Sequence, residues 1–329
     1  MPIRLLKSLV FLLSLFATGA FAVNCQRAQT PVENTVCNSD NLRWLDSTLN
    51  LIYRNMLVKN NSQQVAQQYR EWERSLNNCT SDGCIERAYY EGIGLLSDPV
   101  ENFDWGGLWW NSSAPNMSGG TLQLSRSAEW SVTADIRVWA GNNRDEYTAE
   151  ARKIYNMALI EQMSDTGNCR VLMIPRRSGA LQVYSNADWG CRMSMPGGGF
   201  IDGRYLRAER DPRPAMTLLT MGILPDAAMD ARFRALVGEE YQQFVDTANV
   251  YIYQDDLDNI GASVISMWLR GAANTHNAII MYTATDIWAA RIAPDAHGKN
   301  QLHYFSTRGD DLRTMPRTLA GWRMRYLDR

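Results

Sequence analysis

The first part of the chain carries apolar residues at helical spacing. Five of them recur every three or four positions and share one helix face: Leu42, Leu45, Leu49, Tyr53 and Met56. After the polar run at 60–62, a second stripe follows: Val65, Tyr69, Trp72 and Leu76. The pattern predicts an antiparallel helical hairpin. Thr30, Pro31 and Glu33 match a capping box, which predicts a helix start at Pro31, and Pro99 marks the end of the helical region.

Between residues 100 and 207 the apolar pattern changes to a period of two, which is typical of half-buried strands. The longest alternation has five members: Trp130, Val132, Ala134, Ile136 and Val138. Shorter alternations occur at Leu122 and Leu124, Val171 and Met173, and Leu181 and Val183. Residues 147–163 admit either a helix, by composition, or two strands. Residues 107–109 and 200–205 bracket the segment, and their pairing would close an antiparallel β-barrel.

The run Arg-Asp-Pro-Arg-Pro at 210–214 is a proline-spaced linker, and the pattern changes again after it. Two helices are predicted first, one from Asp226 to Gly238 and one through Tyr241 and Val245. Strands and a closing helix from Arg317 follow, with the strands at 263–269, 278–283, 287–292 and 302–306. The predicted fold class is multidomain α+β. Its parts are a disulfide-stapled helical domain at 23–98, an antiparallel β-barrel domain at 100–207 and an α+β domain with an antiparallel sheet at 215–329.

Residues 1–22 have the features of a secretory signal peptide. Arg4 and Lys7 accompany an apolar run at 5–16, and Ala20-Phe21-Ala22 places small residues where a signal peptidase reads them, so the mature chain would begin at Val23. The apolar run is too short for a membrane span, and no later segment approaches about 18 consecutive apolar residues. No small-residue lipobox precedes Cys25. We therefore predict a periplasmic or secreted protein without stable membrane insertion.

The charge balance is mildly acidic. Lys and Arg total 33 against 35 Asp and Glu, and loss of Arg4 and Lys7 with the leader changes the net charge from −2 to −4. This balance argues against nucleic acid as a partner, because phosphate backbones are bound by clustered cations, and it suits a cationic protein instead.

All the cysteines lie after the leader: Cys25, Cys37, Cys79, Cys84, Cys169 and Cys191. Their even number in an exported chain predicts three disulfides. An antiparallel hairpin would place Cys37 near Cys79 and leave Cys25 for Cys84, although four cysteines allow three pairings and the sequence leaves the choice open. A bridge between Cys169 and Cys191 across adjacent strands is the simplest use of the other two.

The spacing in the helical region resembles the LprI N-terminal domain family, secreted bacterial modules named after a lysozyme inhibitor. The motifs that carry the resemblance are Cys25-(11)-Cys37, Leu42-x-x-Leu45-Asp46-x-x-Leu49-Asn50-x-x-Tyr53, Arg70-x-Trp72, Cys79-(4)-Cys84 and residues 89–96. Tyr69 and Leu76 stand where the family pattern has Gln and Arg. The middle segment resembles small closed β-barrels that accompany such hairpins, which favours two strands over 147–163. The resemblance implies a periplasmic binding protein.

The run Gly-Ala-Ala-Asn-Thr-His-Asn at 271–277 precedes an apolar strand and resembles a loop of the Ivy family, inhibitors of vertebrate lysozyme. In that family a protruding loop presents a histidine to the lysozyme cleft. The resemblance implies binding roles for His276, Asn274, Thr275 and Asn277. The paired cysteines of the Ivy loop are missing here, so a polar residue at an ordinary hairpin turn is the alternative interpretation of His276.

Known catalytic patterns are not evident in the sequence. His276, His297 and His303 lack the spacing of zinc ligands, and no Gly-x-Ser-x-Gly motif occurs. The glycines at 197–199 lack the lysine of a phosphate-binding loop, and the acidic cluster at 255–259 lacks the register of an EF-hand. We predict no catalytic residue, no metal site and no cofactor.

Two hypotheses about function follow. The first is a binding protein that inhibits lysozyme or another peptidoglycan hydrolase by occluding its active-site cleft. The alternative is a cell-envelope carrier or scaffold protein that binds a small apolar ligand or another envelope protein. As the contact surface we favour the helical domain over the His276 loop, because more residues carry its resemblance.

Overall fold

The computed structural model describes residues 22–59, 62–163, 169–187 and 201–327. Residues 1–21 of the predicted signal peptide, Cys191, the glycines at 197–199 and Phe200, each named in a prediction above, lie outside the described residues. Contacts divide the chain into two compact units with a boundary between Leu96 and Ser97. The barrel and the C-terminal sheet therefore belong to one unit. Among the described residues, no helix is both long and apolar enough to cross a lipid bilayer.

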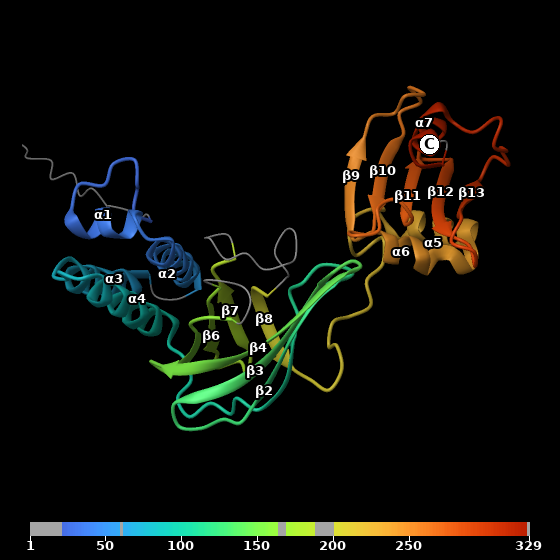
Figure 1. The fold of residues 1–329 in the computed structure, drawn as a ribbon. Coiled ribbons are helices and arrows are strands. Elements are labelled where there is room, and N and C mark those ends of the chain that lie inside the picture. The colour runs from blue at the N-terminus through green and yellow to red at the C-terminus, as the bar shows by residue number, and fades with distance from the viewer. Residues whose placement is uncertain (1–21, 60–61, 164–168, 188–200, 328–329) are drawn as a thin grey trace, which may run out of the picture. The chain divides into compact units, whose positions relative to one another are not determined.

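The first unit is helical, with α1 (Pro31–Cys37), α2 (Asp40–Lys59), α3 (Ser62–Asn77) and α4 (Asp82–Ser97) (Figure 1). The predicted capping box is confirmed, because Thr30 Oγ1 accepts the Glu33 N–H at 3.1 Å and Glu33 Oε2 accepts the Thr30 N–H at 2.8 Å. Both apolar stripes are buried apart from the half-buried Met56 at the end of the first.

Helix α4 was not predicted as a separate helix, and it completes the core of this unit. Trp72 of α3 packs against it, with the indole Nε1 donating a hydrogen bond to the Ala88 carbonyl at 2.6 Å. Gly92 makes this approach possible, since a Cβ at position 92 would lie 2.4 Å from that same Nε1. The Trp72 ring also contacts the buried Tyr89, at 5.4 Å between ring centroids.

The preferred disulfide pairing was wrong. The bonds join Cys25 to Cys37 and Cys79 to Cys84, each with a Cα–Cα distance of 5.4 Å. The error came from assuming a hairpin of only two helices. Cys79 and Cys84 instead flank the turn between α3 and α4, and Cys25 folds back onto the end of the short helix α1. Cys169 is also disulfide-bonded, and Cys191, its predicted partner, is outside the described residues.

Both bonds close short loops, and this predicts their contribution to stability. Replacing Cys79 and Cys84 together by serine, or Cys25 and Cys37 together, should lower the free energy of unfolding by about 2–3 kcal/mol, because each loop is short. Chemical denaturation of the two variants measures the loss, and a peptide map of the unreduced protein checks the pairing. A peptide cross-linked from Cys37 to Cys79 would contradict the structure.

The second unit begins with an antiparallel closed barrel, as predicted. Its strands follow chain order: β1 (Gly107–Asn111), β2 (Ser118–Ser125), β3 (Ser131–Ala140), β4 (Asn143–Ile154), β5 (Met157–Ile160), β6 (Val171–Pro175), β7 (Leu181–Ser185) and β8 (Gly203–Arg207). Closure pairs Trp109 with Arg207 and Asn111 with Tyr205. The two-strand prediction for 147–163 is confirmed by β4 and β5, which a two-residue turn joins.

That turn consists of Tyr155 and Asn156, with φ of 47° and 60°. Two consecutive left-handed residues match the twist of antiparallel strands in a tight hairpin. Inside the barrel, the alternating residues predicted from the sequence form one buried apolar cluster, in which Val132, Ile136 and Val183 are each at most 1% exposed. Side chains therefore fill the barrel interior. The prediction was wrong for Trp130, which precedes β3 and is 67% exposed.

The chain then forms a five-stranded antiparallel sheet in the order β13-β12-β11-β10-β9. Its strands are β9 (Val250–Gln254), β10 (Ser263–Trp268), β11 (Asn277–Tyr282), β12 (Ile287–Pro294) and β13 (Asn300–Ser306), and its helices are α5 (Ala227–Val237), η1 (Gly238–Glu240), α6 (Tyr241–Thr247) and α7 (Arg317–Leu327). Phe233 of α5 and Phe244 of α6 pack on one face of the sheet, and Leu319 and Trp322 of α7 pack on the other (Figure 1). The predicted elements are confirmed, and β9 was not predicted.

Two asparagines connect the barrel with the sheet inside this unit. Asn116 Nδ2, before β2, donates to the carbonyls of Val245 and Ala248 at 2.7 and 3.2 Å. Asn249 Nδ2, before β9, donates in return to the Asn116 carbonyl at 2.8 Å and to Ser118 Oγ at 2.9 Å. These hydrogen bonds satisfy backbone carbonyls at the end of α6 and before β2.

Candidate functional site

The predicted binding loop at 271–277 is a compact turn. The His276 N–H donates to the Ala272 carbonyl at 2.8 Å, and the Thr275 N–H donates to the same carbonyl at 3.0 Å. Thr275 Oγ1 lies 3.0 Å from His276 Nδ1. Partial burial, followed by the nearby positive charge of Arg291, lowers the pKa of His276. The imidazole is therefore held neutral within the turn.

The four predicted contact residues do not form one surface. Asn277 is completely buried in β11, where no partner protein could touch it, so the binding prediction is corrected at this residue. Asn274 is exposed, and its carbonyl accepts a hydrogen bond from Asn300 Nδ2 at 2.9 Å. The strand predicted from the periodicity began at Ala278, so Asn277 was assigned to the loop, whereas β11 begins at Asn277 and buries its side chain.

A buried ion pair lies on the same sheet face as His276. Arg291 of β12, with 7% of its side chain exposed, donates from Nη2 to Glu240 Oε2 at 2.7 Å. Glu240 Oε1 lies 2.8 Å from His303 Nδ1. These groups satisfy one another, which indicates a structural role.

The acidic loop at 255–259 also has a structural role. Asp256 Oδ2 accepts the N–H groups of Ile260 and Ala262 at 2.7 and 3.1 Å. Asp258 accepts the N–H groups of Arg317 and Thr318 at 2.8 and 3.0 Å, which caps the start of α7. Among the described residues, no group of three or more acidic, histidine or cysteine side chains is arranged to hold a metal ion.

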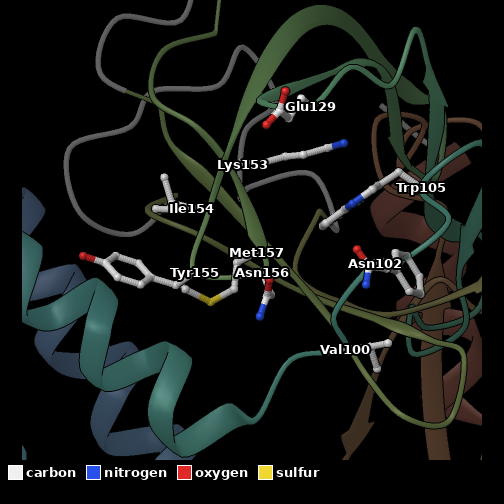
Figure 2. A pocket seen from close by; sticks show the side chains of 10 residues that line it. Val100, Asn102, Trp105, Glu129, Lys153, Ile154, Tyr155, Asn156 and Met157 are labelled. Atoms are coloured by element: carbon white, nitrogen blue, oxygen red, sulfur yellow. The ribbon is translucent and has the colours of Figure 1, made fainter.

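A cavity of about 330 Å³ lies beside the β4–β5 hairpin of the barrel. Its lining comes from the segment before β1, the β2–β3 connection and the hairpin itself: Val100, Asn102, Phe103, Trp105, Glu129, Lys153, Ile154, Tyr155, Asn156 and Met157 (Figure 2). Aromatic and apolar groups thus meet one cation, one anion and two amides. This mixture suits a polar partner better than a purely apolar ligand.

Lys153 is the cation of this cavity, and the alternation of β4 places its side chain on the inward side of the strand. Tyr147, Ala149 and Ala151 are the inward residues of β4, and Lys153 continues the same alternation beyond them. Its ammonium donates to Ser127 Oγ at 2.9 Å and to the Ala128 carbonyl. The β2–β3 connection therefore fixes the position of the charge at the end of the barrel.

An exposed aromatic residue is joined to this lysine through the backbone. The Trp130 carbonyl accepts the Lys153 backbone N–H at 2.7 Å, and the Trp130 side chain is 67% exposed. We call Ser127, Trp130 and Lys153 the lysine rim. Tyr155, 43% exposed, points in the opposite direction from Lys153 in Figure 2. Exposed tryptophans are enriched among the residues that dominate binding energy, and a fixed cation is complementary to an acidic protein surface.

The lysine rim was not predicted from the sequence. Lys153 lies in the stretch that admitted either a helix or strands, and Trp130 was assigned to a half-buried strand. One signal was present in the sequence. The inward positions of β4 are apolar up to Ala151, and the next inward position is a lysine, Lys153.

Comparisons of the chain with models of protein families, with curated proteins and with solved structures found no match.

Proposed function

We propose that this chain is a secreted binding protein of the bacterial cell envelope, which occludes the active-site cleft of a peptidoglycan hydrolase of the lysozyme type. The observation that carries the proposal is the lysine rim, in which a cation with a fixed position is joined by a backbone hydrogen bond to a residue with an exposed side chain, Trp130. The disulfides Cys25–Cys37 and Cys79–Cys84 support an oxidising compartment.

The target chemistry follows from the enzyme class. Glycoside hydrolases place two carboxyl groups on either side of the scissile bond, at separations of about 5–9.5 Å. An ammonium group that enters such a cleft would bond to those carboxylates and occupy the place of a sugar. Because Ser127 and Ala128 already hold Lys153, little side-chain entropy is lost on binding. Trp130 would supply apolar contact area at the edge of the same surface.

This proposal moves the expected contact from the helical domain and the His276 loop to the barrel. The LprI-like spacing still supports a secreted binding protein. The compact turn at 271–277 and the burial of Asn277 remove the support for a protruding loop. In the described part of the barrel, side chains fill the interior, and we therefore rank a carrier for an apolar ligand second.

The test is a turbidity assay of lysozyme on bacterial cell walls with added residues 23–329. Wild-type protein should inhibit, and Lys153→Met or Trp130→Ala should raise the inhibition constant at least ten-fold, or about 1.4 kcal/mol. Lys299→Met is the matched control, because Lys299 is an exposed lysine on the β12–β13 turn and is not part of the lysine rim. This control should inhibit like the wild type.

Two results would overturn the proposal. If neither a lysozyme nor any other peptidoglycan hydrolase is inhibited, the binding function itself fails. If Lys153→Met and Trp130→Ala inhibit like the wild type, the contact lies elsewhere and the lysine rim is not the site.

A further inference from the structure

A buried carboxylate in the helical unit contacts the residue at which the mature chain is predicted to begin. Asp46 of α2 is 6% exposed. Its Oδ1 accepts hydrogen bonds from the Tyr89 hydroxyl and from Asn50 Nδ2, both at 3.1 Å. Its Oδ2 accepts the backbone N–H of Val23 at 2.8 Å.

Asp46 has no cationic side chain as a partner within the described part of the chain. A buried carboxylate held only by neutral donors is costly to ionise. Burial accordingly raises the pKa of Asp46, against the opposing effect of the Val23, Tyr89 and Asn50 donors. Asp46 interacts electrostatically with Tyr69 and Tyr89, and both phenols are neutral near pH 7, since burial raises the pKa of each. No described side chain therefore brings a positive charge to Asp46.

Val23 is the residue that follows the signal-peptidase sequence Ala20-Phe21-Ala22. Before cleavage, its nitrogen belongs to a peptide bond and is neutral. When a signal peptidase hydrolyses the Ala22–Val23 bond, water supplies hydroxyl to the Ala22 carbonyl carbon and hydrogen to the Val23 nitrogen, and the amine then takes up a proton from solvent. The nitrogen already placed at 2.8 Å from Asp46 becomes an ammonium group.

We propose that removal of the leader creates an internal ion pair between the new α-ammonium group of Val23 and the buried carboxylate of Asp46. Asp46 is then the binding site for the chain's own mature N-terminus. A neutral hydrogen bond becomes a charge-assisted one, which is shorter and stronger. Export processing therefore stabilises the helical unit and orders the segment that leads to the Cys25–Cys37 bond.

This inference rests on one part of the proposed function, the export of the protein with removal of its leader. It does not depend on which enzyme, if any, the protein binds. Its test compares two chains with defined N-termini, residues 23–329 and residues 22–329. The additional Ala22 displaces the ammonium group by about 3.8 Å, one Cα–Cα step. Neither measurement below involves a hydrolase, so the result is independent of the inhibition assay.

The first measurement is NMR titration of the α-amine after reductive ¹³C-methylation. In residues 23–329 the α-amine should titrate at least one unit above the ordinary range of about 7.7–8.0, and in residues 22–329 it should titrate within that range. The second measurement is chemical denaturation. With Asp46 present, residues 22–329 should have an unfolding equilibrium constant at least ten-fold higher than residues 23–329. When both chains carry Asp46→Asn, the two constants should differ less than two-fold.

The proposal is overturned if the α-amine of residues 23–329 titrates in the ordinary range, or if Ala22 has the same effect with and without Asp46→Asn. It is also overturned if the exported protein begins at a residue other than Val23. Should Asp46→Asn prevent folding, the titration of the two wild-type chains decides alone.

Discussion

Replacing Gly92 by valine should lower the free energy of unfolding of the helical unit by about 2–3 kcal/mol, the upper part of the usual range of about 1–3 kcal/mol for overpacking a core. A Cβ at position 92 would lie 2.4 Å from Trp72 Nε1 and 2.7 Å from Leu49 Cδ1. The Trp72 ring would have to move, and its hydrogen bond to Ala88 would be lost. Helix propensity alone gives the opposite sign, because glycine is a poor helix former. Urea denaturation followed by tryptophan fluorescence measures the effect.

Gly83 in the same helix is the matched control. A Cβ at position 83 would meet nothing within 4 Å. Gly83→Val should therefore leave stability unchanged or raise it slightly, following propensity alone. Equal losses at positions 83 and 92 would contradict the packing that we describe for α4.

Arg291→Ala should cost about 3–5 kcal/mol, the range for removing one partner of a buried ion pair. The loss has two sources, since the Arg291 contacts disappear and Glu240, with 24% of its side chain exposed, is left without its main cation. The double variant Arg291→Ala with Glu240→Ala should recover part of the loss, because no unpaired carboxylate remains. Thermal and chemical denaturation of residues 23–329 give both values.

Arg137→Ala provides the comparison for this prediction. Arg137 pairs with Glu146 on the barrel surface at 3.2 Å, and both side chains are about 70% exposed. Solvent screens such a pair, so the cost should not exceed about 1 kcal/mol. If the losses for Arg137→Ala and Arg291→Ala are similar, the Arg291–Glu240 pair is not the buried interaction that the structure shows.

The sequence predicted the elements whose apolar period is regular. The alternation in β2, β3, β6 and β7 required an inward face, and the residues around Trp109 and Tyr205 do pair to close the barrel. Helix α5 was equally clear, since Asp226 caps it and Gly238 ends it. In these cases local pattern and tertiary packing agree, which is why periodicity was sufficient.

Other features depended on contacts that periodicity does not report. Strand β9 was missed because Tyr251, Ile252 and Tyr253 are all exposed at the sheet edge, so no alternation is visible. The disulfide pairing depended on where helices end. Cys79 and Cys84 pair because a turn between α3 and α4 separates them, and Cys37 pairs with Cys25 because it ends the short helix α1. The contact between Asp46 and Val23 joins residues that no local pattern relates.

The order of strands in the barrel has a consequence for how the chain reaches its fold. Every pairing joins consecutive strands except the closure between β1 and β8. Contacts between chain neighbours form quickly, whereas a pairing between distant segments must wait for both and is slow. The hairpins can therefore form early, and closure is delayed until Gly203–Arg207 is available. Until then the sheet has two open edges, which are templates for pairing with other chains. Aggregation during synthesis or export should therefore depend on how long those edges stay open.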